Sequence, residues 1–159
     1  MNSIMTDYYS TFELYQALRN QLMAIVTDKD LAFSPGGDNP SLGALCKQIG
    51  EVQVSYIESF KTYQQDFDYR MQEPGLQGSV DGLLSWFHEL DKELRSVIES
   101  YSEEDLRNKV IDRGGNFIVP PQIQLEIYKE ALLIFYGKCS VYLRLLGKTL
   151  PEQWLHWIG

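Results

Sequence analysis

Hydrophobic residues recur at three- and four-residue steps over four long stretches of the chain. This spacing places side chains on one face of a helix, so each stretch predicts an amphipathic helix. The stretches run from about Thr11 to Val26, from Ser41 to about Phe67, from Ser79 to Tyr101 and from Pro121 to about Leu146. Ser41 is a suitable N-cap after Pro40, and Gly147 is a suitable C-terminal cap.

Shorter elements are predicted between and after these helices. Residues 102–105 favour a short helical turn, and residues 110–111 and 117–119 flank a Gly-Gly turn that forms either a small hairpin or a loop. Residues 150–158 predict one more turn, whose two tryptophans are expected to pack across the end of the bundle. On the third helix, Asp91 and Arg95 are expected to form an exposed pair four residues apart.

Four helices with one apolar face each must bury those faces against one another. The economical arrangement is an all-α four-helix bundle that forms a single domain over residues 1–159. The connections at 27–40 and 102–120 are long enough to cross the bundle, so a simple up-down-up-down order is not required.

Composition narrows the functional classes. The formal net charge is −8 and the pI is about 4.7, which disfavours nucleic acid, because phosphates attract basic surfaces. No apolar run approaches the ~20 residues of a membrane span. Only two cysteines are present, and nothing before the first helix looks like a signal peptide. We therefore expect a cytoplasmic protein without a membrane or nucleic-acid partner.

Familiar catalytic motifs are absent. The chain has no phosphate-binding loop, no dinucleotide fingerprint, no Cys-x-x-Cys and no His-Glu-x-x-His. Its two histidines, His88 and His156, are far apart, and Cys46 and Cys139 lie next to apolar residues within helices. We expect both cysteines to be buried as small hydrophobic residues.

Polar side chains on two otherwise apolar helical faces indicate a candidate pocket. One face carries Gln48, Glu51 and Ser55, and the other includes Tyr128 and Lys138. If the two faces meet, they border an aromatic cavity suited to an uncharged or amphipathic small molecule. Ordinary packing with an exposed Glu51 is the other interpretation. The candidate pocket residues are Gln48, Glu51, Tyr128, Ala131, Phe135 and Tyr142.

Two segments carry a family resemblance. Residues 40–51, Pro-Ser-Leu-Gly-Ala-Leu-Cys-Lys-Gln-Ile-Gly-Glu, and residues 137–147, Gly-Lys-Cys-Ser-Val-Tyr-Leu-Arg-Leu-Leu-Gly, resemble the second and fourth helices of the DinB-like superfamily. This superfamily consists of four-helix bundles and includes metal-dependent thiol transferases. The resemblance implies the same bundle and no DNA binding.

The resemblance also implies where a metal site would lie. Members with a metal take one histidine from the second helix and two, four residues apart, from the fourth. The matching positions here are Gln48, Ala131 and Phe135. Gln48 is a poor neutral ligand, and the other two residues cannot ligate. We therefore expect no metal, no cofactor and no catalytic residue, and a non-catalytic small-ligand-binding or interaction module.

Two further expectations concern activity and assembly. The alternative function is a metal-dependent thiol transferase or isomerase-like enzyme that uses substitute ligands, for which His88, Glu51 and Glu130 are the candidates. A homodimer through a helical face is expected because the chain has ten tyrosines, seven phenylalanines and three tryptophans, and aromatic residues are enriched at interfaces.

Overall fold

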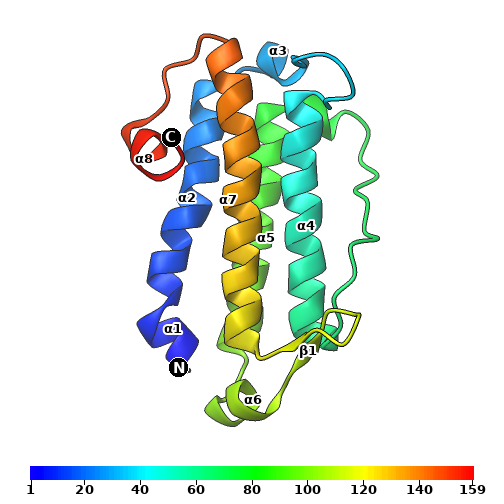
Figure 1. Cartoon of the computed structure of the whole chain (residues 1–159), viewed down its shortest axis with the longest axis vertical. Helices are drawn as coiled ribbons and strands as arrows, with labels where there is room; N and C mark the ends of the chain where they lie inside the picture. The colour runs from blue at the N-terminus through cyan, green and yellow to red at the C-terminus, as the bar shows by residue number, and fades with distance from the viewer.

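Four long helices form the body of the computed structural model, which describes all 159 residues (Figure 1). Each long helix is joined to the next one in the sequence by a connection that contains short helices or strands. The long helices are α2 (Tyr9–Ile25), α4 (Leu42–Thr62), α5 (Val80–Glu99) and α7 (Pro121–Leu145). The predicted all-α four-helix bundle is therefore confirmed.

Short elements occupy the ends and sides of the bundle. The predicted turn after α5 is confirmed as a helix. Of the two forms left open for residues 110–119, a hairpin or a loop, the structure has the hairpin, with two antiparallel strands and Ile111 opposite Val119. The short elements are α1 (Ser3–Asp7), α3 (Asp28–Leu31), the 3-10 helix η1 (Leu76–Gly78), α6 (Glu103–Asn108), β1 (Ile111–Asp112), β2 (Ile118–Val119) and α8 (Glu152–Trp157).

The helices run in an up-down-down-up order. In Figure 1, α2 and α7 run one way, and α4 and α5 run the other. Both α2 and α4 pack against α5 and α7, so α2 and α4 lie on one diagonal of the bundle and α5 and α7 on the other. The connections at 26–41 and 100–120 cross the two ends between diagonal helices. A third connection, residues 63–79, returns along the length of the bundle (Figure 1).

The second helix ends five residues earlier than the pattern predicts. Tyr63 takes a left-handed conformation with φ +63° and caps the helix after Thr62. Gln64 then forms a parallel bridge with Asp112 of the hairpin, and the Gln65 backbone N–H donates to the Asp112 carbonyl at 2.8 Å. The chain thus leaves α4 to pair with the hairpin, and Phe67 lies outside the helix.

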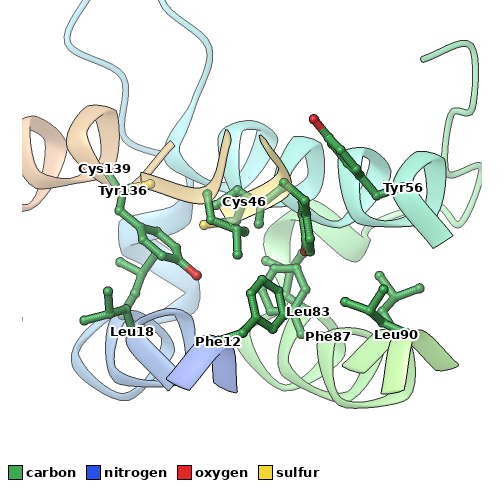
Figure 2. Close-up of a cluster of buried hydrophobic side chains, with 14 of the residues drawn as sticks. Phe12, Leu18, Cys46, Tyr56, Leu83, Phe87, Leu90, Tyr136 and Cys139 are labelled. Atoms are coloured by element: carbon green, nitrogen blue, oxygen red, sulfur yellow. The ribbon is translucent and has the colours of Figure 1, made fainter. Parts of the chain in front are cut away.

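A continuous apolar core fills the space between the four long helices (Figure 2). Side chains from α2, α4, α5 and α7 meet there, including Phe12, Cys46, Phe87 and Tyr136. Both cysteines are free and completely buried, as the sequence predicts. No helix is long and apolar enough to span a lipid bilayer.

Two predicted contacts are wrong. Asp91 does not pair with Arg95, because its Oδ1 accepts a hydrogen bond from the buried Arg19 of α2 at 2.6 Å, while Arg95 pairs with Glu13 and Glu99. The tryptophans of α8 do not cover the end of the bundle. Trp154 instead packs against its side, where its Nε1–H donates to the Leu18 carbonyl at 2.9 Å.

Candidate functional site

A cavity of about 310 Å³ opens between α4, α7 and the extended segment 63–75. Gln48, Glu51 and Ser55 of α4 do share one face, and they form one wall of the cavity. Phe135 and Lys138 of α7 form the opposite wall. The full lining consists of Gln48, Glu51, Val52, Ser55, Phe67, Arg70, Phe135 and Lys138.

Glu51 holds the extended segment against α4. Its carboxylate Oε1 accepts a hydrogen bond from the Met71 backbone N–H at 3.0 Å and lies 3.5 Å from the Lys47 ammonium. The residue is only 7% exposed, so the interpretation with an exposed Glu51 is wrong. Because the carboxylate already has a cation and a backbone donor, its negative charge is largely compensated within the site.

The extended segment contributes two lining residues, Phe67 and Arg70. The Phe67 ring lies edge-on to Tyr56, with 6.0 Å between ring centroids. Arg70 donates from Nη1 to the carbonyls of Phe67 and Tyr69, both at 2.6 Å. Those bonds fold the arginine back on its own segment and keep its guanidinium at the cavity.

A hydrogen-bonded group anchors the start of the extended segment. The Gln124 amide of α7 donates to Gln65 Oε1 at 2.7 Å and to the Ser59 hydroxyl at 2.8 Å. Arg113 of the hairpin region donates to Gln124 Oε1 at 2.7 Å. Gln124 is completely buried, and these partners satisfy its amide, as a buried polar group requires.

The remaining predicted pocket residues lie elsewhere. Tyr142 lines an adjoining hollow of about 290 Å³ that also contacts Gln48 and Lys138, and its hydroxyl donates to the Pro40 carbonyl at 2.8 Å. Burial raises the pKa of the Tyr142 phenol. Tyr128 is completely buried beside Tyr56, so it does not line the cavity.

Ala131 is half-buried against the core and also does not line the cavity. The three positions that match the metal histidines of the resemblance are therefore only partly together. Gln48 and Phe135 face the cavity, and Ala131 lies beside it.

Metal-ligating side chains do not gather anywhere in the structure. No group of three or more His, Cys, Asp or Glu residues lies close enough to hold an ion. The candidate substitute ligands His88, Glu51 and Glu130 do not converge, since His88 and Glu130 are exposed and Glu51 binds Lys47 and the Met71 N–H. The residues present do not fit a resident metal ion.

Sequence reasoning missed Val52, Phe67 and Arg70. The sequence pattern predicts a helix through residue 67, so it gives no extended segment that would carry Phe67 and Arg70 to the cavity. A signal for the true conformation does exist, because Phe67, Tyr69 and Met71 alternate with polar residues. A two-residue period is typical of extended chain.

Comparison with known proteins identifies the fold. No model of a protein family matches the chain, and no curated protein matches it. A DinB-like protein from Bacillus cereus ATCC 10987 superposes with a TM-score of 0.74 at 14% identity, over 91% of this chain and 93% of that one. A DinB-like protein from Bacillus subtilis superposes with a TM-score of 0.70 at 20% identity, over 89% and 93%. The chain therefore has the DinB-like fold.

Proposed function

We propose that this protein is a metal-free, non-catalytic module that binds a small amphipathic molecule between α4, α7 and the segment 63–75. The observation that supports it is the cavity of about 310 Å³ with a mixed apolar and charged lining. Ligand sites are typically concave, largely apolar and supplied with a few orienting polar groups. Gln48 and Phe135, which replace metal histidines in the resemblance, lie in this lining.

The lining indicates which chemistry the ligand carries. Val52, Phe67 and Phe135 offer apolar surface for a ring or an alkyl chain. Arg70 and Lys138 supply two cations, whereas the single carboxylate, Glu51, is compensated by Lys47 and the Met71 N–H. An apolar body with a carboxylate or another anionic group fits this distribution of charge.

A thermal-shift screen tests the proposal. The probes are aromatic and alkyl carboxylates, each compared with its uncharged amide. We expect carboxylates to raise the melting temperature, and Arg70→Glu to abolish the rise. Arg144→Glu is the matched control, since Arg144 is an exposed arginine of α7 that does not line the cavity. Ser55→Leu, which fills the cavity, should also abolish binding.

The proposal fails if no carboxylate or amide stabilises the chain, or if Ser55→Leu leaves every shift unchanged. Elemental analysis of protein purified without a histidine tag supplies a second test. Stoichiometric zinc, nickel or manganese would overturn the metal-free assignment in favour of a metal-dependent transferase or isomerase.

We also propose a cytoplasmic homodimer. The two cysteines are free and buried, which fits a reducing compartment. Large apolar side chains remain exposed on α7, including Ile134 at 62%, and contiguous exposed apolar surface is typical of interaction sites. Analytical ultracentrifugation tests the assembly, and a strict monomer at high concentration would overturn it.

A further inference from the structure

The cavity and the adjoining hollow form one groove between α4 and α7. The two helices lie side by side (Figure 1), and the cavity of about 310 Å³ shares Gln48 and Lys138 with the hollow of about 290 Å³. On α4, the lining residues of both spaces recur at three- and four-residue steps from Leu45 to Ser55, which places them on one helical face. Ten residues of α-helix rise about 15 Å, so a ligand of about that length can lie along the groove.

Two cations reach the cavity without a carboxylate partner. Neither Arg70 nor Lys138 forms an ion pair within the chain, although the formal net charge of the protein is −8. The Lys138 ammonium lies 5.2 Å from the centre of the Phe135 ring, so a positive charge stands beside an apolar wall. A carboxylate bonded to the same carbon as an apolar side chain matches this arrangement of charge and ring.

The adjoining hollow offers a mainly apolar surface. Its apolar lining consists of Pro40, Leu45 and the ring of Tyr142. The Tyr142 hydroxyl already donates to the Pro40 carbonyl at 2.8 Å. The Asn39 amide likewise donates to the Gly36 carbonyl at 2.8 Å. Since no charged side chain lines the hollow except at its junction with the cavity, it favours an uncharged alkyl chain over a second anion.

Gln48 determines which chemical group suits the junction between the two spaces. It is exposed on α4 and borders both the cavity and the hollow. Its side-chain amide both donates and accepts hydrogen bonds, and a secondary amide in a ligand does the same. An amide linker therefore meets a complementary partner at the point that any ligand spanning both spaces must pass.

We propose that the groove binds an N-acylated apolar amino acid. Its carboxylate and side chain occupy the cavity beside Lys138 and Phe135. Its amide pairs with Gln48, and its acyl chain lies in the adjoining hollow. This inference rests on the proposed function and names the class of molecule bound: a carboxylate with an apolar body fills the cavity alone, whereas the acyl chain uses the hollow as well.

A ligand series of increasing length tests the use of both spaces. Phenylpropanoate carries only the part that fits the cavity, and N-acetyl-phenylalanine and N-butanoyl-phenylalanine extend it by an amide and a growing acyl chain. Isothermal titration calorimetry measures each dissociation constant. We expect the constant to fall about three- to fourfold for each methylene added to the acyl chain, because each one is removed from water.

Two tryptophan substitutions locate the acyl chain. Asn39→Trp fills the adjoining hollow and should remove the dependence on chain length, while phenylpropanoate binds as before. Asp38→Trp is the matched control, because Asp38 is the neighbouring exposed residue and does not line the hollow. It should leave the whole series unchanged, and thermal melting followed by circular dichroism checks that both variants fold.

Gln48→Leu tests the pairing with the ligand amide. The ester analogue of N-butanoyl-phenylalanine, in which oxygen replaces the amide N–H, lacks one hydrogen-bond donor. We expect the unmodified chain to bind the amide about tenfold more tightly than the ester. Gln48→Leu should bind the two alike, and an undiminished preference for the amide in this variant would overturn the assigned role of Gln48.

The outcomes separate this inference from the proposed function. If phenylpropanoate binds but the acyl chain adds no affinity, the N-acyl assignment is wrong and the cavity alone remains the site. Length dependence that persists in Asn39→Trp overturns the assignment in the same way. If no member of the series binds, both proposals are overturned.

Discussion

Arg19 of α2 donates from Nη2 to Asp91 Oδ1 of α5 at 2.6 Å, with the arginine side chain completely buried. The same carboxylate oxygen accepts from the amides of Gln16 at 2.8 Å and Gln53 at 2.9 Å, so three helices meet at one acceptor. The guanidinium carbon also lies 4.2 Å from the centre of the Phe87 ring. Burial lowers the pKa of Arg19, but the Asp91 carboxylate and the nearby phenols of Tyr136 and Tyr128 together outweigh burial, and the pKa is raised overall.

Removing this carboxylate should destabilise the fold strongly. We expect Asp91→Ala to lower the free energy of unfolding by about 3 kcal/mol, because a buried guanidinium is left without its counter-ion. Asp91→Asn should cost less, since the amide oxygen still accepts hydrogen bonds. Equilibrium urea denaturation measures the difference. The matched control is Arg95→Ala, which breaks a half-exposed pair with Glu13 and should cost less than about 1 kcal/mol. Equal losses in the two variants would contradict this account.

The same residues show why the bundle was predictable and its polar core was not. The apolar positions Leu83, Phe87 and Leu94 are buried, as their spacing predicts. Charged residues are normally exposed, and the sequence pattern accordingly assigns Asp91 to an exposed pair with Arg95. Only the arrangement of α2, α4 and α5 around the core brings the partners of Arg19 and Asp91 together. That arrangement depends on contacts between residues distant in the sequence, which a local pattern does not contain.

The candidate site was partly predictable for a related reason. Helical spacing places Gln48, Glu51 and Ser55 on one face, and they lie together in the cavity. The contribution of residues 63–75 depends on where α4 ends, and that end is set by the pairing of Gln64 with Asp112, almost fifty residues later. Spacing alone also does not decide how deeply Tyr128 is buried.

Buried tyrosines should make the protein unstable at alkaline pH. Burial raises the pKa of Tyr8 to about 12 and raises the pKa of Tyr9, Tyr128 and Tyr136 as well. In the unfolded chain these phenols ionise near pH 10, so the unfolded state releases protons first. The free energy of unfolding should therefore be unaffected below about pH 10 and should fall as the pH rises from there through about 12.

Ultraviolet absorbance of tyrosinate measures this effect. The native protein should ionise only part of its ten tyrosines near pH 10, and the rest should ionise together with unfolding, as followed by circular dichroism. Chain unfolded in urea is the reference in which all ten titrate together. Native protein that matches this reference would contradict the burial of these phenols.

Alanine substitution at either of two glycines of α4 should lower the free energy of unfolding, for a different reason at each position. A Cβ at Gly50 would lie 2.2 Å from the Trp86 ring, and one at Gly43 would lie 1.8 Å from the Gln77 carbonyl oxygen. Overpacking of this kind costs about 1–3 kcal/mol. We expect Gly43→Ala to cost more than Gly50→Ala, because the backbone of η1 cannot rotate away as a side chain can.

A double-mutant cycle separates the two effects. In a Trp86→Leu background, Gly50→Ala should lose most of its penalty, whereas Gly43→Ala should keep it. Urea denaturation at low protein concentration measures each variant. Gly137→Ala is the control, since its Cβ meets nothing within 4 Å. It should stabilise the isolated chain by about 0.5–1 kcal/mol. A penalty at Gly50 that persists without Trp86 would contradict the contact.

Cys46 of α4 and Cys139 of α7 should report when the contact between these two helices opens. Cys46 and Cys139 are both completely buried, and a hydrogen bond with Cys46, together with burial, raises the pKa of the Cys139 thiol. Because the thiolate is the reactive form, iodoacetamide should modify neither residue in the native protein at neutral pH. Both should react at once in urea.

The rate of this modification should follow global stability. If labelling requires unfolding, its rate is proportional to the unfolded fraction, so Asp91→Ala should accelerate it by roughly a hundredfold for a loss of about 3 kcal/mol. Arg95→Ala should change it only a few-fold. Mass spectrometry of labelled protein identifies which thiol reacts. Rapid labelling of Cys139 alone in the native protein, with no acceleration in Asp91→Ala, would show instead that α7 opens locally beside the cavity.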